Sequence, residues 1–204
     1  MSTTRLLLLG AVRIFQPVHG YLLRRELLSW QVEHWAHVKP GSIYSGLRTL
    51  TRLALVEEVG EDPVAYRLTM DGETEYLRLL SLALREPAFN DPTRLLAGLC
   101  FMTTLPRAEV REALRARSLV LEAQVSGVLS AVRSIEELRN APPSTAELNR
   151  VAVHWLEGER AWVRDVCGRI DAGHYRFLGE PGYDVGPVDG QWPPAVLDDT
   201  GKGA

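Results

Sequence analysis

The stretch that decides the fold runs from Lys39 to Val56 and reads Lys-Pro-Gly-Ser-Ile-Tyr-Ser-Gly-Leu-Arg-Thr-Leu-Thr-Arg-Leu-Ala-Leu-Val. Pro40 suits the first position of a helix, where its missing N–H costs nothing. One face of this helix is apolar, because four residues recur at helical spacing: Ile43, Leu47, Leu50 and Ala54. The pattern predicts an amphipathic helix that buries this face and exposes the other.

The exposed face of this helix carries hydroxyl and guanidinium groups and no carboxylate. Its residues are Gly41, Ser45, Arg48 and Arg52, with Ser42, Tyr44 and Thr49 beside them. Such a face is able to contact phosphates and base edges. An ordinary solvated helix face is the other interpretation of the same residues, so the flanking sequence has to decide between them.

The segment before Lys39 predicts two helices. Residues 5–15 are apolar nearly all round, which is typical of a central, buried helix. Pro17 ends it, because the residue before a proline is pushed out of the helical region. A second helix begins near Tyr21 and ends near Trp30.

The segment after the deciding stretch changes its period. Residues 55–59 and 64–68 are short β-like runs, and Gly60-Glu-Asp-Pro63 between them has a turn composition. Thr69 is a good N-cap for a helix over residues 70–85. Three helices, a hairpin and a further helix predict a winged helix-turn-helix, in which the third helix enters the major groove.

A set of motifs occurs in order over the first 80 residues: Leu6–Gly10, Pro17-Val-His-Gly-Tyr21, Pro40-Gly-Ser-Ile-Tyr44 with Leu47, Leu50 and Leu53, Leu55-Val-Glu57, and Tyr66-Arg-Leu-Thr69 with Gly72. This ordered set resembles the PadR family of bacterial transcriptional regulators. The resemblance implies a DNA-binding regulator that forms a homodimer through a helical C-terminal region. For this chain it implies DNA contacts from Lys39, Gly41, Ser42, Tyr44, Ser45, Arg48 and Arg52.

The hairpin departs from the family pattern. Members commonly carry a basic wing before the Tyr-Arg-Leu-Thr strand, whereas residues 57–65 hold four carboxylates and no cation. Carboxylates facing phosphates are repulsive, and each lost phosphate contact reduces the salt dependence of binding. The wing is therefore expected to be a poor DNA clamp, which leaves binding mostly to the third helix.

The second half of the chain predicts long helices. One runs from Pro106 to Leu138, and its apolar residues from Leu121 onward alternate at spacings of four and three, as in a coiled-coil seam. The partner of this seam is a helix of the same chain, a second subunit, or both. Ser144-Thr-Ala-Glu147 reads as a capping box for a last helix, closed by Gly173. The predicted dimerisation residues are Leu121, Val125, Val128, Val132, Trp155 and Trp162.

The predicted fold is therefore mainly α, with three parts. Residues 1–85 form a winged-helix DNA-binding domain with a two-stranded hairpin, residues 86–177 a long-helix dimerisation domain, and residues 178–204 a Gly/Pro-rich acidic tail. Within the tail, Tyr183 and Trp192 are candidates for docking on the body.

Composition limits the function. The 204 residues carry a net charge of −3, so affinity for nucleic acid must come from a local basic face. Two distant cysteines, no signal peptide and no apolar run of membrane length favour a cytoplasmic protein without a membrane partner. No catalytic constellation is found, and no cofactor is predicted. His34 and His37 beside Glu33 read as a polar loop, so no metal site is predicted.

The sequence thus predicts a homodimeric transcriptional regulator, a repressor, that binds operator DNA and is released by a small-molecule effector or a partner. An aromatic effector is considered because tryptophan suits stacking, and the candidate residues are Trp30, Trp35 and Trp155. Packing in the core or an interface is the alternative role for each of them. The alternative function is a winged-helix adaptor or antagonist that acts through protein–protein contact with weak or no DNA binding.

Overall fold

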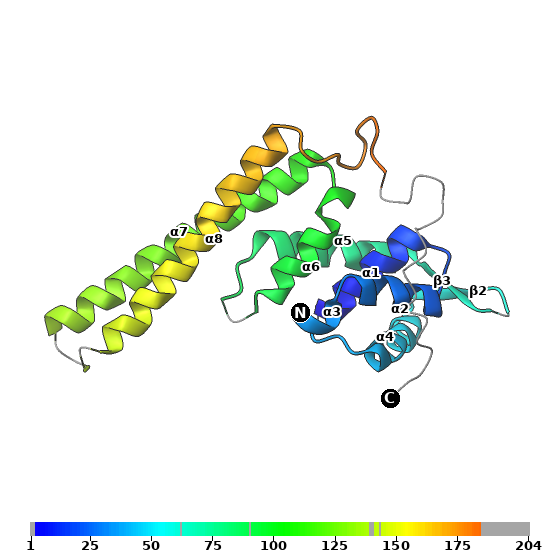
Figure 1. The fold of residues 1–204 in the computed structure, drawn as a ribbon, viewed down its shortest axis with the longest axis horizontal. Coiled ribbons are helices and arrows are strands. Elements are labelled where there is room, and N and C mark those ends of the chain that lie inside the picture. The colour runs from blue at the N-terminus through cyan, green and yellow to red at the C-terminus, as the bar shows by residue number, and fades with distance from the viewer. Residues whose placement is uncertain (1–2, 62, 90, 139–140, 143, 185–204) are drawn as a thin grey trace. The chain divides into compact units, whose positions relative to one another are not determined.

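The computed structural model describes residues 3–61, 63–89, 91–138, 141–142 and 144–184. These residues divide into two compact units (Figure 1). The first comprises the described residues up to Leu80 together with residues 182–184, and the second comprises Ser81–Pro181. The division falls inside a continuous helix, five residues before the boundary predicted at residue 85.

The first unit is a winged helix, which confirms the predicted fold class. Its elements are α1 (Thr3–Phe15), β1 (Val18–His19), α2 (Gly20–Ser29), α3 (Val32–Trp35), α4 (Pro40–Arg52), β2 (Val56–Val59), β3 (Ala65–Leu68) and the first part of α5 (Met70–Arg85). The strands form an antiparallel sheet in the order β1-β3-β2. Tyr66 of the central strand β3 lies opposite Val18 of β1 on one side and opposite Glu58 of β2 on the other. β1 and α3 were not predicted, because two and four residues are too few to show a period.

The core of this unit forms around α1, which is buried from Leu6 to Val12. α4 packs on α1 through Ile43, Leu47 and Leu50, as its apolar spacing predicts. Ala54, the fourth residue predicted on this apolar face, does not belong to it. The helix ends at Arg52, and Ala54 is exposed with a left-handed φ of 55°, because the chain turns there into β2.

The turn into α5 is fixed by Thr69. Its hydroxyl donates to the carbonyl of Ala54 (2.7 Å) and accepts from the N–H of Gly72 (3.0 Å), which confirms the predicted N-cap. Gly72 is required here, since a Cβ would lie 1.9 Å from the carbonyl oxygen of Leu55.

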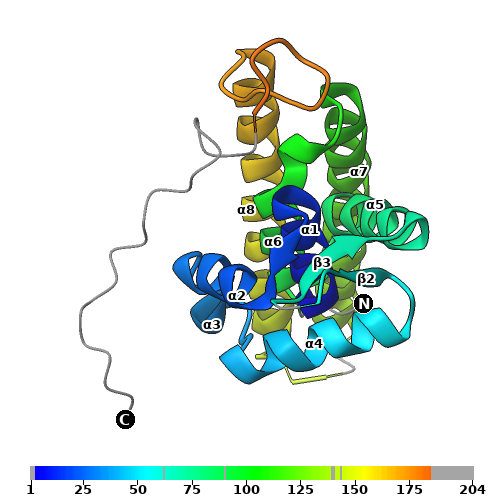
Figure 2. The ribbon, with the colours of Figure 1, turned by 90° about the vertical axis from the view of Figure 1, so that its right-hand side faces the viewer.

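The second unit begins with the end of α5, followed by α6 (Thr93–Phe101), the 3₁₀ helix η1 (Met102–Thr104), α7 (Arg107–Leu138) and α8 (Thr145–Asp171). α7 and α8 lie side by side as a helical hairpin (Figures 1 and 2). The helix predicted from Pro106 to Leu138 begins one residue later, at Arg107, and ends at Leu138 as predicted. The predicted capping box is wrong, because Ser144 is in a helical conformation and caps nothing, and Glu147 pairs with Arg150 instead.

The seam on α7 is covered by α8 of the same chain. Leu121, Val125 and Val132 are buried where the two helices pack, and α8 contributes Val153, Leu156, Val163, Val166 and Ile170. The sequence left open whether this seam packs on a helix of the same chain, on a second subunit, or on both. In the structure it packs on α8 of the same chain. The three buried valine and leucine side chains are not on a surface that a second subunit can reach.

A buried arginine connects three helices of the second unit. Arg117 of α7 is 2% exposed, and its guanidinium donates to the carbonyls of Ala83, Leu84 and Glu86 at the end of α5. It also donates to the Glu159 carboxylate of α8 at 2.6 Å. Desolvation lowers the pKa of Arg117. The last carbonyls of α5 thus obtain their hydrogen bonds from a charged side chain of α7.

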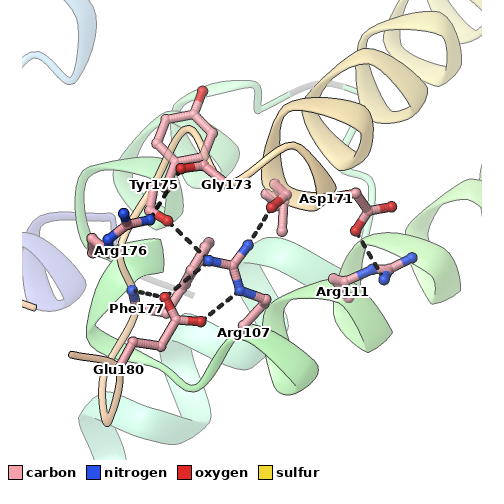
Figure 3. Close-up of polar contacts among 9 residues, drawn as sticks. Arg107, Arg111, Asp171, Gly173, Tyr175, Arg176, Phe177 and Glu180 are labelled. Carbon is pink, nitrogen blue, oxygen red and sulfur yellow. Dashed lines mark hydrogen bonds and ion pairs between the residues drawn. The ribbon is translucent and has the colours of Figure 1, made fainter.

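The segment after α8 is anchored and not loose (Figure 3). Arg107 binds the Glu180 carboxylate through Nε (2.5 Å) and a second nitrogen (2.9 Å), and its guanidinium lies 4.8 Å from the centre of the Phe177 ring. Phe177 is fully buried, and the N–H of Leu178 donates to the carbonyl of Thr103. Leu178 and Glu180, the described start of the predicted tail, thus make defined hydrogen bonds with the second unit. Residues 185–204, including Trp192, lie outside the described residues.

Candidate nucleic-acid interface

The outward face of α4 carries the predicted DNA-contacting residues. Figure 2 shows α4 along the lower edge of the winged-helix unit. Ile43 and Leu47 fix its rotation, since they are fully buried. On the outward face, all the predicted residues except half-buried Ser42 are exposed: Lys39, Gly41, Tyr44, Ser45, Arg48 and Arg52. Six of the seven predicted residues are therefore exposed along α4 and its N-cap, and Ser42 is half-buried.

The hydroxyl groups of this face have a defined orientation. Ser45 Oγ donates to the carbonyl of Ser42 at 3.2 Å, and Thr49 Oγ1 donates to the carbonyl of Ser45 at 2.9 Å. Because their protons are directed into the helix backbone, these oxygens offer lone pairs outward. Such acceptors match the amino groups of adenine and cytosine at the major-groove edge.

The cations of the winged-helix unit separate into two groups. Nine Lys and Arg residues lie among residues 1–80. Five of them form ion pairs with carboxylates: Arg5, Arg13, Arg25, Arg67 and Arg78. Among the described residues, no carboxylate pairs with the other four: Arg24, Lys39, Arg48 and Arg52. Three of these four belong to α4 or its N-cap, so the uncompensated positive charge gathers where the sequence predicts DNA contact.

Tyr66 of β3 joins this surface, which the sequence did not predict. A Cβ on Gly20 would lie 3.3 Å from the Tyr44 ring and 3.5 Å from the Tyr66 ring, so both rings lie against the same glycine. Burial raises the pKa of Tyr66, and the Glu58 charge raises it further, while the Arg48 charge lowers it. Tyr66 therefore links α4 to the hairpin. Tyr66 is part of the Tyr-Arg-Leu-Thr motif, but the sequence spacing of a strand residue does not predict that it lies beside α4.

The hairpin is less acidic than predicted. Arg67 of β3 lies opposite Glu57 of β2 and binds its carboxylate at 2.7 Å. Arg67 lies just outside the residues 57–65 whose charges predicted an acidic wing, and it thus adds one positive charge to the hairpin. Glu58 and Glu61 are exposed and form no ion pair with the described residues, and Asp62 lies outside them. The wing keeps a surplus of negative charge beside α4.

The candidate effector tryptophans have different surroundings. The indole N–H of Trp35 donates to the carbonyl of Trp30, and the Trp30 ring packs 6.3 Å from the Phe15 ring. Both belong to the winged-helix unit. Trp155 belongs to the second unit, is 63% exposed, and packs its ring 5.4 Å from that of Phe89.

The predicted dimerisation residues also divide into groups. Leu121, Val125 and Val132 are buried within the chain, Val128 and Trp162 are half-buried, and Trp155 is exposed. Around Trp155, α8 exposes an apolar stripe that the sequence did not single out, formed by Leu148 (73% exposed), Val151 (44%) and Trp155. Over the described residues, no group of three or more potential metal ligands comes together. No helix in the described part of the chain has the length and apolarity to cross a membrane.

Comparison with known proteins gives matches among solved structures. No protein-family model and no curated protein matches the chain. PadR of Bacillus subtilis in complex with p-coumaric acid is 20% identical, with a TM-score of 0.35, and the match covers 83% of this chain and 99% of that one. A Streptococcus mutans protein is 16% identical, with a TM-score of 0.34 over 80% of this chain and 98% of that one. A PadR-like transcriptional regulator of Bacillus cereus is 15% identical, with a TM-score of 0.33 over 83% and 99%.

Proposed function

We propose that the chain is a DNA-binding transcriptional regulator that reads the major groove with α4. The observation that carries this proposal is the distribution of cations. Within the winged-helix unit, arginines elsewhere are mostly paired with carboxylates, whereas Lys39, Arg48 and Arg52 are exposed and pair with no described carboxylate. Unpaired cations beside outward-facing hydroxyls are what a helix needs to bind a phosphate backbone and contact base edges.

The residues of α4 divide by the group that each would contact. Lys39 precedes the first turn and Arg52 ends the helix, so they are placed for phosphates on either side of a groove. Ser42, Tyr44, Ser45 and Arg48 lie between them and would face the bases. Gly41 has no heavy atom within 4 Å of its Cβ position, which leaves room for close approach of the nucleic acid.

Useful affinity requires two copies. Two phosphate contacts per subunit release few counterions, while four in a homodimer give a slope of log K against log salt of about −4. Two α4 helices would then contact half-sites about 34 Å apart. For the dimer contact we propose the exposed stripe of Leu148, Val151 and Trp155, because the seam residues of α7 are already covered by α8. The regulator would act as a repressor, released by an effector that favours a different separation of the two α4 helices.

The test is a selection of bound sequences from random duplex DNA, followed by affinity measurements on the selected site. Arg48→Ala is expected to weaken binding about tenfold or more and to relax the preference at the base pair that Arg48 contacts. Arg52→Ala is expected to weaken binding to all sequences alike and to reduce the magnitude of the salt slope by about one unit per subunit. Arg78→Ala is the matched control, since Arg78 is also an exposed arginine of the same unit but is paired with Glu75. It should bind like the wild type.

Two results would contradict the proposal. One is a selection that yields no enriched sequence at low salt. The other is equal binding by the wild type, Arg48→Ala and Arg78→Ala. If DNA binding is absent and a protein partner is recovered whose binding depends on Glu58 and Glu61, the adaptor function replaces it. That alternative rests on the surplus negative charge of the hairpin.

A further inference from the structure

An exposed apolar pair lies where α4 ends and α5 begins. Leu53 follows α4 directly and is 47% exposed, and Met70 begins α5 and is 84% exposed. The hydroxyl of Thr69 donates to the carbonyl of Ala54, so the two chain segments that carry this pair are held together. Large apolar side chains left this exposed on neighbouring segments form a patch on which another segment can pack.

A hollow of about 410 Å³ adjoins the same two segments. Leu53 and Leu55 line it from the connection between α4 and β2, and Asp71 and Thr74 are among the residues that line it from α5. A recess beside an exposed apolar pair gives one large side chain a place to anchor.

Positive charge lies next to this apolar patch. Arg52 directly precedes Leu53, and Arg48 lies one turn earlier on the outward face of α4. Both arginines are exposed, and neither pairs with a carboxylate of the described residues. A segment that covers this surface therefore needs apolar side chains followed by carboxylates.

The chain carries this complementary pattern in its last 20 residues. Residues 192–197 read Trp-Pro-Pro-Ala-Val-Leu, and Asp198 and Asp199 follow at once. Apolar side chains thus stand directly before a pair of negative charges, as Leu53 stands directly after Arg52. The pattern matches the surface in both hydrophobicity and charge.

The described part of the chain leads to this surface. Residues 182–184 belong to the winged-helix unit. Burial raises the pKa of Tyr183 and the charge of Arg13 acts in the opposite direction, so Tyr183 lies close to α1. Arg13 pairs with Glu73, which lies one turn along α5 from Met70. Eight further residues reach Trp192, and they span up to about 26 Å, whereas a helix with its side chains is about 10–12 Å across.

We propose that residues 192–199 bind the winged-helix unit of the same chain across this surface. Their apolar side chains cover Leu53 and Met70, and the two carboxylates pair with Arg52 and Arg48. A segment of the same chain meets its site at an effective concentration of about millimolar, so even a weak contact is populated. The contact itself does not depend on DNA. That it competes with DNA for Arg48 and Arg52 rests on the proposed function.

Zero-length carbodiimide cross-linking detects the contact in the absence of DNA. The reagent joins a carboxylate to an amine that touches it, and the chain has two lysines, Lys39 and Lys202. In the full chain with Arg52→Lys, peptide mapping should find the new amine joined to Asp198 or Asp199. Lys39 is the internal control, because it lies about 20 Å away at the other end of α4 and should give no such product.

Trp192→Ala tests the consequence for DNA binding without changing the net charge. It should tighten binding to the selected DNA at least about threefold, since a face that is covered two thirds of the time binds about threefold more weakly. Val188→Ala is the matched control, because it shortens an apolar side chain of the same tail outside residues 192–199. It should bind DNA like the wild type.

Two cross-linking results overturn the contact: no product at Arg52→Lys, or a product of equal yield at Lys39. A product that joins two chains instead of one assigns the surface to the tail of a second copy and overturns the intrachain contact. Equal DNA affinity of Trp192→Ala and the wild type overturns the competition. If the intrachain product forms and no selected DNA is bound, the contact stands and the proposed function fails.

Discussion

Gly46 is the residue on which the position of α4 depends. An ideal Cβ there would lie 2.3 Å from Cδ1 of the buried Leu8, so any side chain at this position requires Leu8 to move within the core between α1 and α4. The same helix carries Gly41, whose Cβ position is open. One glycine is thus needed for packing and the other is not, although both lie in a helix where glycine is intrinsically unfavourable.

Gly46→Ala is expected to lower the free energy of unfolding by about 1–3 kcal/mol, because the added methyl overpacks the contact with Leu8. Gly41→Ala should leave it unchanged or raise it slightly. Urea denaturation followed by circular dichroism measures both. Equal effects of the two substitutions, or additive effects of Gly46→Ala and Leu8→Ala in the double variant, would show that the two residues do not meet.

Glu180 gives the stability of the segment after α8 a dependence on pH. The guanidinium of Arg107 is the largest cause that lowers its pKa to about 2, below the ordinary 4.5. A carboxyl with a lowered pKa in the folded state stabilises it fully above the ordinary pKa. This contribution is lost as the pH falls through the folded value.

The difference in unfolding free energy between the wild type and Glu180→Gln should therefore be constant above about pH 4.5 and shrink as the pH falls toward about 2. Chemical denaturation at several pH values measures it. Glu157→Gln, which removes an exposed carboxylate of α8, should show no comparable change. A gap of the same size at pH 7 and pH 2.5 would contradict the role given to the Arg107–Glu180 pair.

At the scale of elements, Arg117 determines how α5 ends. Three carbonyls of its last turn and of the residue beyond accept from this one guanidinium, and Glu159 of α8 compensates the charge. A buried charge of this kind does not add stability as a simple pair would, but removing one partner leaves the others unsatisfied.

Arg117→Met is expected to lower the free energy of unfolding by about 3–5 kcal/mol, because it leaves the Glu159 carboxylate and the α5 carbonyls without their donor. Arg115→Met changes an exposed arginine two residues away and should stay within about 0.5 kcal/mol of the wild type. Thermal and urea unfolding give both values. A loss below about 1 kcal/mol for Arg117→Met would mean that water replaces the guanidinium.

Sequence patterns predicted the long, periodic elements and failed where contacts are made across the chain. α1, α4, α5, α7 and the β2–β3 hairpin were found because apolar spacing and turn residues are local signals. β1 has two residues and exists through pairing with Tyr66, so no local pattern shows it. On the candidate interface, the α4 residues were predicted from their helical spacing. Tyr66 and the Glu57–Arg67 pair were missed, because both depend on strand register.

At the scale of the whole molecule, the proposed dimer makes two similar substitutions behave differently. Val151 lies on the exposed stripe of α8 and is 44% exposed, whereas Val125 is 8% exposed between α7 and α8. Aspartate at Val151 should dissociate the dimer and keep the helical content. Val125→Asp should unfold the helical hairpin of α7 and α8, since it buries an unpaired charge. Sedimentation velocity and circular dichroism separate the two effects, and a Val151→Asp variant that remains a dimer would move the contact elsewhere.

The helix α5 has a consequence for how this chain tolerates insertions. Its buried residues Tyr76, Leu79, Leu80, Ala83 and Leu84 recur at steps of three and one, and the unit division falls after Leu80. One apolar stripe therefore serves two cores. One added residue between Leu80 and Ala83 would turn the rest of the helix by about 100°, while seven added residues would nearly restore the phase. This chain is thus expected to tolerate length changes in its loops, and within α5 only those that restore the helical phase.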